Sequence, residues 1–141
     1  MIHVNDLPTD KKIILYDGVC ALCNRWVQWV IARDKQDTYR FVAQESDLGQ
    51  RILKHIGVDT RQTDSIVLYQ PGWAYYQKSQ AVLEILNELT PAGLGAIPLR
   101  LVPGKLRDVL YDRVAKTRYA KYGKLDACPT PDPSIKHKFL Y

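Results

Sequence analysis

The sequence is poor in the features that mark exported, disulfide-stabilised or membrane-spanning proteins. It has three cysteines in 141 residues, too few and of the wrong parity for a disulfide scaffold. No run approaches the ~20 apolar residues that a membrane span requires, so we expect no membrane span. Residues 1–8 lack both the basic start and the apolar run of a signal peptide. We therefore expect a cytoplasmic protein, in which a close cysteine pair is catalytic or metal-binding.

The bulk composition is that of a globular protein with one core. Hydrophobic residues make up 46% of the chain and charged residues 25%, close to the values of soluble domains and far from those of disordered chains. The length permits a single sizeable core, so we expect one domain over residues 1–141. The formal net charge of +5 permits an acidic partner without requiring nucleic acid.

The hydrophobic pattern predicts alternating strands and helices after an N-terminal arm at residues 1–10. Short runs rich in β-formers predict four strands, at 12–16, 39–43, 65–69 and 73–76. Apolar residues at helical spacing, with Ser46 and Ser79 as N-caps, predict three helices, at 20–34, 46–57 and 79–89. The order β-α-β-α-β-β-α over a core at 12–90 is the α/β plan of the thioredoxin-like fold, with parallel pairing early and an antiparallel hairpin late.

A helical region is expected after this core. Prolines punctuate residues 93–103, which predicts a short helical piece or a packed connector. A longer helix is predicted at 104–122, with Gly123 as its stop, and its apolar residues are expected to face inward: Leu106, Val109, Leu110, Val114 and Tyr119. The sequence therefore predicts a helical extension at 91–124 and an irregular tail at 125–141.

Two cysteines stand where the first predicted strand meets the first predicted helix, in Cys20-Ala21-Leu22-Cys23. A thiolate attacks a disulfide, and a helix start stabilises a thiolate through unpaired backbone N–H groups and the positive end of the helix dipole. Cys23 lies one turn later, close enough to attack a mixed disulfide on Cys20. The spacing predicts a thiol-disulfide oxidoreductase with Cys20 as nucleophile and Cys23 as resolving thiol, and it leaves the direction of exchange open.

Asp17 lies three residues before Cys20. A carboxylate near a dithiol is a candidate acceptor for the Cys23 proton during resolution. The alternative interpretation is that Asp17 only shapes the Asp-Gly turn. Both interpretations remain open at this point.

The stretch at residues 16–23, Tyr-Asp-Gly-Val-Cys-Ala-Leu-Cys, resembles the Asp-x-x-Cys-x-x-Cys signature of the thiol-disulfide oxidoreductase DCC family. Individually weaker matches extend the resemblance over residues 12–130, at 64–68, 79–83, 97–98, 111–112, 118–119, Gly123 and Cys128. The resemblance implies a thioredoxin-like fold and dithiol exchange with a protein disulfide or a low-molecular-weight thiol. It names no substrate, and we expect no cofactor.

Three of the matching positions are candidates for substrate binding or for shaping the site: Asp64, Ser65 and Ser79. Better-known thioredoxins carry a cis-proline just before the third strand, whereas this chain has no proline near Thr63 and Asp64. An acidic side chain at that place would disfavour a facing Cys20 thiolate. The alternative is that Asp64 is a loop residue preceding a strand.

Cys128 is open to three interpretations. It is a third redox cysteine that takes the disulfide from the first pair, a lone partly buried thiol, or a ligand. In the last case Cys20, Cys23 and Cys128, with His137 as a fourth ligand, would form a noncatalytic metal-binding or interaction module. A structural zinc needs four well-placed ligands, and one Cys-x-x-Cys with scattered residues supports that weakly, so we expect no metal.

Residues 100–124 carry eight lysines and arginines against two aspartates, with three tyrosines interleaved. This pattern fits a nucleic-acid surface, a solvated helix face or a docking face for an acidic redox partner. No recognised nucleic-acid motif accompanies the charges. We therefore expect a solvated face and no nucleic-acid partner.

Overall fold

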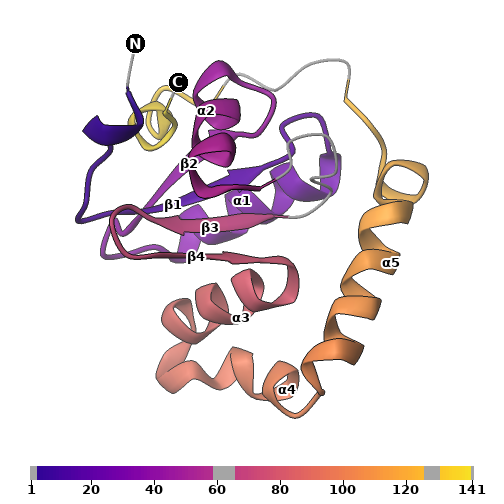
Figure 1. The fold of residues 1–141 in the computed structure, drawn as a ribbon. Coiled ribbons are helices and arrows are strands. Elements are labelled where there is room, and N and C mark those ends of the chain that lie inside the picture. The colour runs from indigo at the N-terminus through magenta and orange to yellow at the C-terminus, as the bar shows by residue number, and fades with distance from the viewer. Residues whose placement is uncertain (1–2, 59–65, 126–130, 141) are drawn as a thin grey trace.

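A mixed sheet of four strands lies at the centre of the fold (Figure 1). The computed structural model describes residues 3–58, 66–125 and 131–140. In sheet order β2-β1-β3-β4, β1 pairs parallel with β2 and antiparallel with β3, and β3 pairs antiparallel with β4. The four predicted strands are confirmed, the last two displaced by one or two residues, at β1 (Lys12–Tyr16), β2 (Tyr39–Ala43), β3 (Val67–Gln70) and β4 (Ala74–Gln77).

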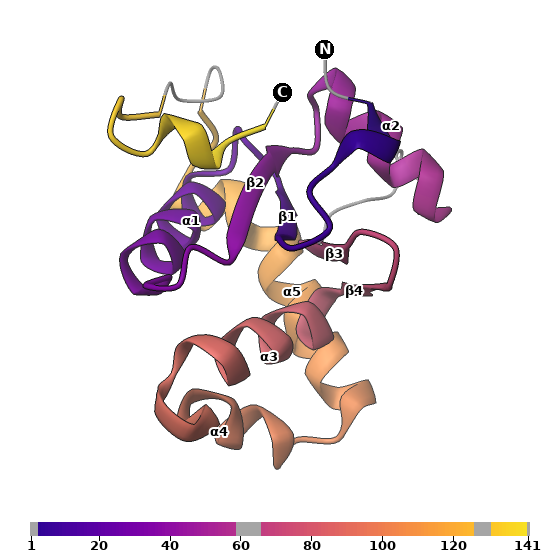
Figure 2. The same cartoon turned by 90° about the vertical axis from the view of Figure 1, so that its left-hand side faces the viewer.

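Helices cover both faces of this sheet. The first three are α1 (Ala21–Arg33), α2 (Asp47–Ile56) and α3 (Lys78–Leu89). Figure 2 shows the strands between α1 and α2, which lie on opposite faces. With this β-α-β-α-β-β-α order and sheet topology, the structure confirms the thioredoxin-like α/β fold.

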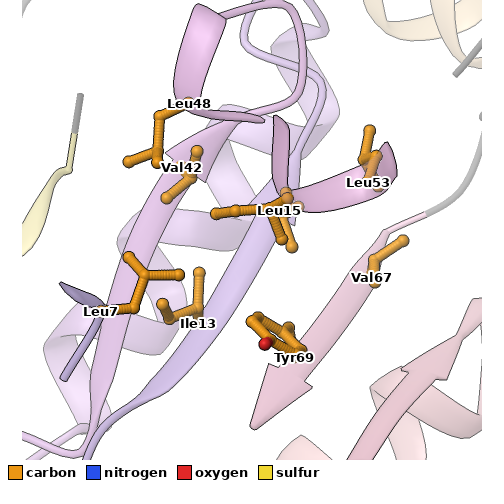
Figure 3. Close-up of a cluster of buried hydrophobic side chains, with 9 residues drawn as sticks. Leu7, Ile13, Leu15, Val42, Leu48, Leu53, Val67 and Tyr69 are labelled. Carbon is orange, nitrogen blue, oxygen red and sulfur yellow. The ribbon is translucent and has the colours of Figure 1, made fainter. Parts of the chain in front are cut away.

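Two hydrophobic clusters hold the layers together, and β1 contributes to both because its side chains alternate between the faces. Ile13 and Leu15 pack below α2 in the cluster drawn in Figure 3. Ile14 and Tyr16 point the other way, into the cluster formed with α1 and α3. All four side chains are buried, so β1 is the doubly buried strand that its apolar run indicates.

The caps of α2 follow the sequence signals. Ser46 Oγ accepts the Gly49 N–H at 3.0 Å, and Gly57 ends the helix in the left-handed region at φ 80°, which glycine adopts without steric cost. Both caps were predicted and are confirmed.

The chain beyond α3 forms the expected helical extension. A 3-10 turn (Pro91–Ala96) and the short α4 (Ile97–Arg100) lead into α5 (Gly104–Tyr122). Figure 1 shows α5 running back from α4 alongside the body of the molecule. It ends at Gly123, where φ is 101°. Both bounds agree with the sequence prediction.

The predicted inward face of α5 is wrong for Leu106, Val109, Leu110 and Val114, which are 49–62% exposed. Tyr119 does face inward, where its hydroxyl bonds to Asp17. The rest of the helix face that meets the body is polar or small, with contacts through Asp108, Tyr111, Ala115 and Arg118. Hydrogen bonding, rather than burial of aliphatic side chains, therefore orients α5.

The tail predicted as irregular is partly ordered against the free edge of β2. A 3-10 turn (Lys136–Lys138) is followed by Phe139, which forms a parallel bridge with Phe41. The Leu140 N–H donates to Phe41 O at 2.8 Å, and Lys138 Nζ lies 2.6 Å from Asp37 Oδ1. These contacts cover part of an otherwise open strand edge.

Within the described part of the chain, no helix has the length and apolar character needed to cross a membrane.

Candidate active site

A short loop carries the chain from the end of β1 into α1 and places the first cysteine. The Asp17 carboxylate accepts the Val19 N–H at 3.1 Å, and the Cys20 N–H donates to Asp17 O at 3.2 Å. Asn24 Nδ2 donates to Gly18 O at 2.8 Å and to Cys20 O at 2.9 Å. These bonds satisfy backbone groups that a tight turn leaves unpaired. The loop is therefore tied to the first turn of α1.

Cys20 is the N-cap of α1, as its place in the sequence indicates. Its Sγ accepts the Cys23 N–H at 3.2 Å, so the sulfur lies at the positive end of the helix. Both thiols are free, with Cys20 buried at 0% exposure and Cys23 half-buried. The predicted strand-to-helix placement of the pair, one turn apart, is confirmed.

The surroundings of Cys23 favour its protonated form. Burial is the largest cause that raises its pKa, followed by the hydrogen bond to the Cys20 side chain and the charge of Cys20, with the negative charge of Asp17 adding to them. The guanidinium of Arg118 acts in the opposite direction. The pKa of Cys23 consequently lies well above that of an ordinary thiol.

Asp17 links this loop to α5. Arg118 Nη2 donates to Asp17 Oδ2 at 3.0 Å, and the Tyr119 hydroxyl donates to the same oxygen. The side chains of Arg118 and Asp17 are only 8% and 16% exposed. Burial, together with the bond to Asp17, raises the pKa of Tyr119 to about 12. Asp17 does shape the Asp-Gly turn, and it also anchors a helix a hundred residues away.

The backbone that follows α5 lies against Cys20. The Ala21 N–H donates to Gly123 O at 3.2 Å, and the Leu125 N–H donates to Val19 O at 2.7 Å. Between these bonds Lys124 and Cys20 form an antiparallel bridge. Residues 123–125 therefore contribute to the complete burial of Cys20.

A pocket of about 270 Å³ opens beside Cys23, between the end of β1, α1, α3 and α5. Its lining is mainly apolar, with one thiol and one ion pair, and consists of Tyr16, Asp17, Leu22, Cys23, Trp26, Ile66, Val82, Tyr111, Val114, Ala115 and Arg118. The Tyr111 hydroxyl accepts the Ile66 N–H at 2.8 Å, which holds α5 to the start of β3. Burial is the main cause that raises the pKa of Tyr111 to about 12.

The other candidate residues are placed as follows. Ser79 does not cap α3, so that prediction is wrong: α3 begins at Lys78 with Gln77 as its N-cap, and no side-chain bond caps it. Ser79 is the second residue of α3 rather than the residue before it, and its buried hydroxyl donates to Asp108 on α5. Asp64, Ser65 and Cys128 lie outside the described residues.

No group of three or more His, Cys, Asp and Glu side chains among residues 3–58, 66–125 and 131–140 is arranged to hold a metal ion. His137, which the sequence suggested as a fourth ligand, is exposed in the tail. The described part of the site therefore consists of two thiols, one ion pair and an apolar pocket.

Sequence reasoning assigned no part in the site to Arg118, Tyr119, Tyr111 or Asn24, although it expected Tyr119 to face inward. One signal was available, since positions 111, 115 and 118 share a helix face at the i, i+4, i+7 spacing. A face made of tyrosine, alanine and arginine does not stand out as buried, which is why the aliphatic positions were chosen instead. The matches of positions 111–112 and 118–119 to the family marked Tyr111, Arg118 and Tyr119 without giving the reason.

The sheet topology and the thiol pair at the start of α1 define a thioredoxin-like protein with a Cys-x-x-Cys site. Within that class, the family model for DCC1-like thiol-disulfide oxidoreductase matches residues 14–124. The chain belongs to this family, which confirms the resemblance seen in the sequence. The family name supports a general thiol-disulfide oxidoreductase role.

Two relatives are similar over most of the chain. The uncharacterized protein YuxK of Bacillus subtilis (strain 168) is 38% identical over 130 residues, which cover 92% of this chain and 94% of the relative. A DCC family protein of Arabidopsis thaliana, designated chloroplastic, is 39% identical over 121 residues, covering 84% of this chain and 70% of the relative. No solved structure matches the chain significantly.

Proposed function

We propose that the protein is a thiol-disulfide oxidoreductase that exchanges a dithiol for a disulfide at Cys20 and Cys23, with a protein disulfide or a low-molecular-weight thiol as partner. The observation that carries this proposal is the contact between Cys20 Sγ and the Cys23 N–H, 3.2 Å apart at the start of α1. A thiolate at this place is stabilised by the backbone donor and the helix dipole. Cys20 is therefore the nucleophile of the proposed cycle.

Cys23 is the resolving thiol, and its surroundings change in the course of the reaction. In the dithiol form, the hydrogen bond to Cys20 and the Cys20 charge both help to raise the pKa of Cys23. Once Cys20 is bound in a mixed disulfide, it carries no charge, so those two contributions end. Cys23 then loses its proton more readily and attacks Cys20 Sγ to release the partner.

Asp17 is the proposed acceptor of the Cys23 proton, directly or through water. A carboxylate has about four lone-pair sites. Val19 N–H, Arg118 and the Tyr119 hydroxyl occupy three of them. The remaining site on Oδ1 is available to a proton without loss of the contacts that hold α5.

Attack by Cys20 requires local opening, because its side chain is fully buried and residues 123–125 lie against its backbone. A partner that displaces this segment gains access to the sulfur. A reducing compartment such as the cytoplasm is part of the proposal, since there a close cysteine pair is held mainly as the dithiol between turnovers.

The proposal is tested by thiol trapping of the protein equilibrated at a series of glutathione redox poises. The wild type should form an internal Cys20–Cys23 disulfide, and the midpoint of its formation gives the reduction potential, which decides reductant from oxidant. The Cys20→Ser and Cys23→Ser variants should form only mixed disulfides with glutathione. A wild type that never forms the internal disulfide contradicts the cycle.

Metal analysis of freshly purified protein tests the noncatalytic alternative. Stoichiometric zinc that is lost on replacing either Cys20 or Cys23 would replace the oxidoreductase proposal with a metal-binding module. A Cys128→Ser variant in the same series should keep the internal disulfide. Loss of turnover with that disulfide retained would make Cys128 a relay.

A further inference from the structure

The pocket beside Cys23 presents apolar walls with no charge left over for a ligand. Its charged side chains, Asp17 and Arg118, are bonded to one another at 3.0 Å. A carboxylate or ammonium group brought into the pocket would lose water without gaining an opposite charge. An apolar group would bury its surface against Trp26, Val82 and the other apolar walls. The lining therefore favours an apolar group as the occupant of the pocket over the charged groups of a thiol such as glutathione.

The size of the pocket limits its occupant further. At about 270 Å³ it lies just below the ~300–1,000 Å³ of sites that enclose whole small-molecule ligands. That space suits one large apolar side chain. The rest of a substrate that places such a side chain here must lie outside the pocket.

The exposed face of α5 continues from the pocket wall. Leu106, Leu110 and Val114 follow one another at i, i+4 and i+8, so they form one stripe on the helix, which we call the α5 stripe. These side chains are 50%, 51% and 49% exposed. Val114 belongs both to the stripe and to the pocket lining. A contiguous exposed apolar surface that leads into a cleft is typical of an interaction site.

We propose that the substrate is a polypeptide disulfide with a large apolar residue next to its reacting cysteine. The apolar side chain occupies the pocket beside Cys23, and the adjoining polypeptide lies along the α5 stripe. A polypeptide is favoured over a small apolar disulfide because only an extended occupant covers the stripe as well as the pocket. This inference rests on the proposed function and specifies its substrate class.

The exchange is balanced in sulfur, electrons and protons. The Cys20 thiolate bonds to one sulfur of the substrate disulfide, the substrate S–S bond breaks, and the other substrate sulfur leaves as a thiolate that takes a proton from solvent. Cys23 then releases its proton, bonds to Cys20 Sγ, and the second substrate sulfur leaves in the same way. Two electrons pass to the substrate, which becomes a dithiol while the protein becomes the disulfide.

The test uses two disulfide-linked peptide dimers that differ only in the residue before the cysteine, leucine in one and serine in the other. Reduced protein is mixed with each peptide below saturation, and single-turnover rates are measured by acid quenching, alkylation and mass spectrometry. The leucine peptide should react about tenfold faster, the factor that burial of one such side chain readily supplies. Glutathione disulfide serves as a substrate without an apolar side chain.

Two variants and a matched control locate the preference. Ala115→Leu fills the pocket from a position 8% exposed, and Leu110→Ser interrupts the α5 stripe at a half-exposed position where a change of fold is not expected. Both should lower the ratio of the leucine-peptide rate to the serine-peptide rate. Leu94→Ser makes the same kind of change at a 59% exposed leucine outside the stripe and should keep the ratio.

The outcomes separate this inference from the function on which it rests. A wild type that forms the Cys20–Cys23 disulfide and reduces both peptides equally overturns the substrate inference alone. A wild type that neither forms that disulfide nor reduces any disulfide overturns both. Sedimentation velocity tests a second copy of the chain as the occupant: a wild-type dimer that Leu110→Ser dissociates would assign the stripe to self-association and contradict the peptide inference.

Discussion

At the scale of single residues, the Asp17 carboxylate joins parts of the chain that are remote in sequence. It accepts the N–H of Val19 in its own loop, and it also binds Arg118 and Tyr119, which lie 101 and 102 positions away. The Arg118 and Asp17 side chains are both largely buried. Each therefore compensates a charge on its partner that has little contact with water. The Asp17 carboxylate thus connects the dithiol loop to α5 through an ion pair with Arg118 and a bond from the Tyr119 hydroxyl.

Replacing Arg118 with alanine should destabilise the protein by about 3 kcal/mol, because it leaves a largely buried carboxylate without its cation. The measurement is the free energy of unfolding by urea at neutral pH. Arg113→Ala is the matched control, since Arg113 is on the same helix but exposed, and should change stability by less than about 0.5 kcal/mol. Equal effects of the two changes would mean that the Asp17 ion pair does not stabilise the fold.

At the scale of elements, the approach of α2 to the sheet depends on a residue without a side chain. A Cβ built on Gly49 overlaps the carbonyl oxygen of Ala43 at the end of β2 and lies 2.9 Å from the carbonyl oxygen of Gln44. These neighbours are backbone atoms and cannot rotate away. The close packing of the first turn of α2 on the β2–α2 connection therefore requires glycine.

Gly49→Ala should consequently destabilise the protein by about 2 kcal/mol or more, although alanine is the better helix former by about 1 kcal/mol. Gly104→Ala is the control, because a Cβ there meets only Arg107 Nη2, at 3.5 Å, and the change should be neutral or slightly stabilising. Thermal or urea unfolding of the two variants gives the comparison. A stabilised Gly49→Ala protein would show that α2 does not sit this close to the connection.

At the scale of the whole molecule, the packing of α5 against α1, α3 and the dithiol loop accompanies the burial of groups that resist losing their protons. Burial is the leading cause that raises the pKa of Cys23, and it raises those of Tyr111 and Tyr119 to about 12. In each case the folded protein holds the proton at pH values where the unfolded chain has released it. The resulting stability is complete below the unfolded pKa and is lost as the pH rises towards the folded pKa.

Stability should therefore decline above pH 9.0, the ordinary pKa of the Cys23 thiol. Between about pH 8 and about pH 10.5, deprotonation of Cys23 in the unfolded chain should therefore lower the free energy of unfolding progressively. Urea unfolding under a reductant measures it, with Tyr111 adding to the decline above pH 10.0. Serine does not titrate in this range, so Cys23→Ser should show a shallower decline, and identical slopes would contradict the burial of this thiol.

Sequence by itself determined the parts of the structure that depend on neighbouring residues. The strand at residues 12–16, the Ser46 and Gly57 caps of α2, the bounds of α5 and the placement of Cys20 at a helix start all follow from local patterns. Each of these signals lies within about one helical turn or one strand, where hydrophobic period, capping and glycine conformation act. The Asp-x-x-Cys-x-x-Cys stretch identified the family for the same reason.

Only the tertiary structure decided how the dithiol is surrounded. The Asp17–Arg118 ion pair, the bond between Ser79 and Asp108, and the backbone bonds of residues 123–125 around Cys20 join positions separated by 29 to 106 residues along the chain. The orientation of α5 was also decided by the tertiary structure. Its inward face is the one whose Tyr111 and Arg118 bind Ile66 and Asp17, which are distant in the sequence, so the aliphatic residues face outward. Periodicity ranks residues by apolar character, so it cannot identify a face that is buried through hydrogen bonds to groups brought near only by folding.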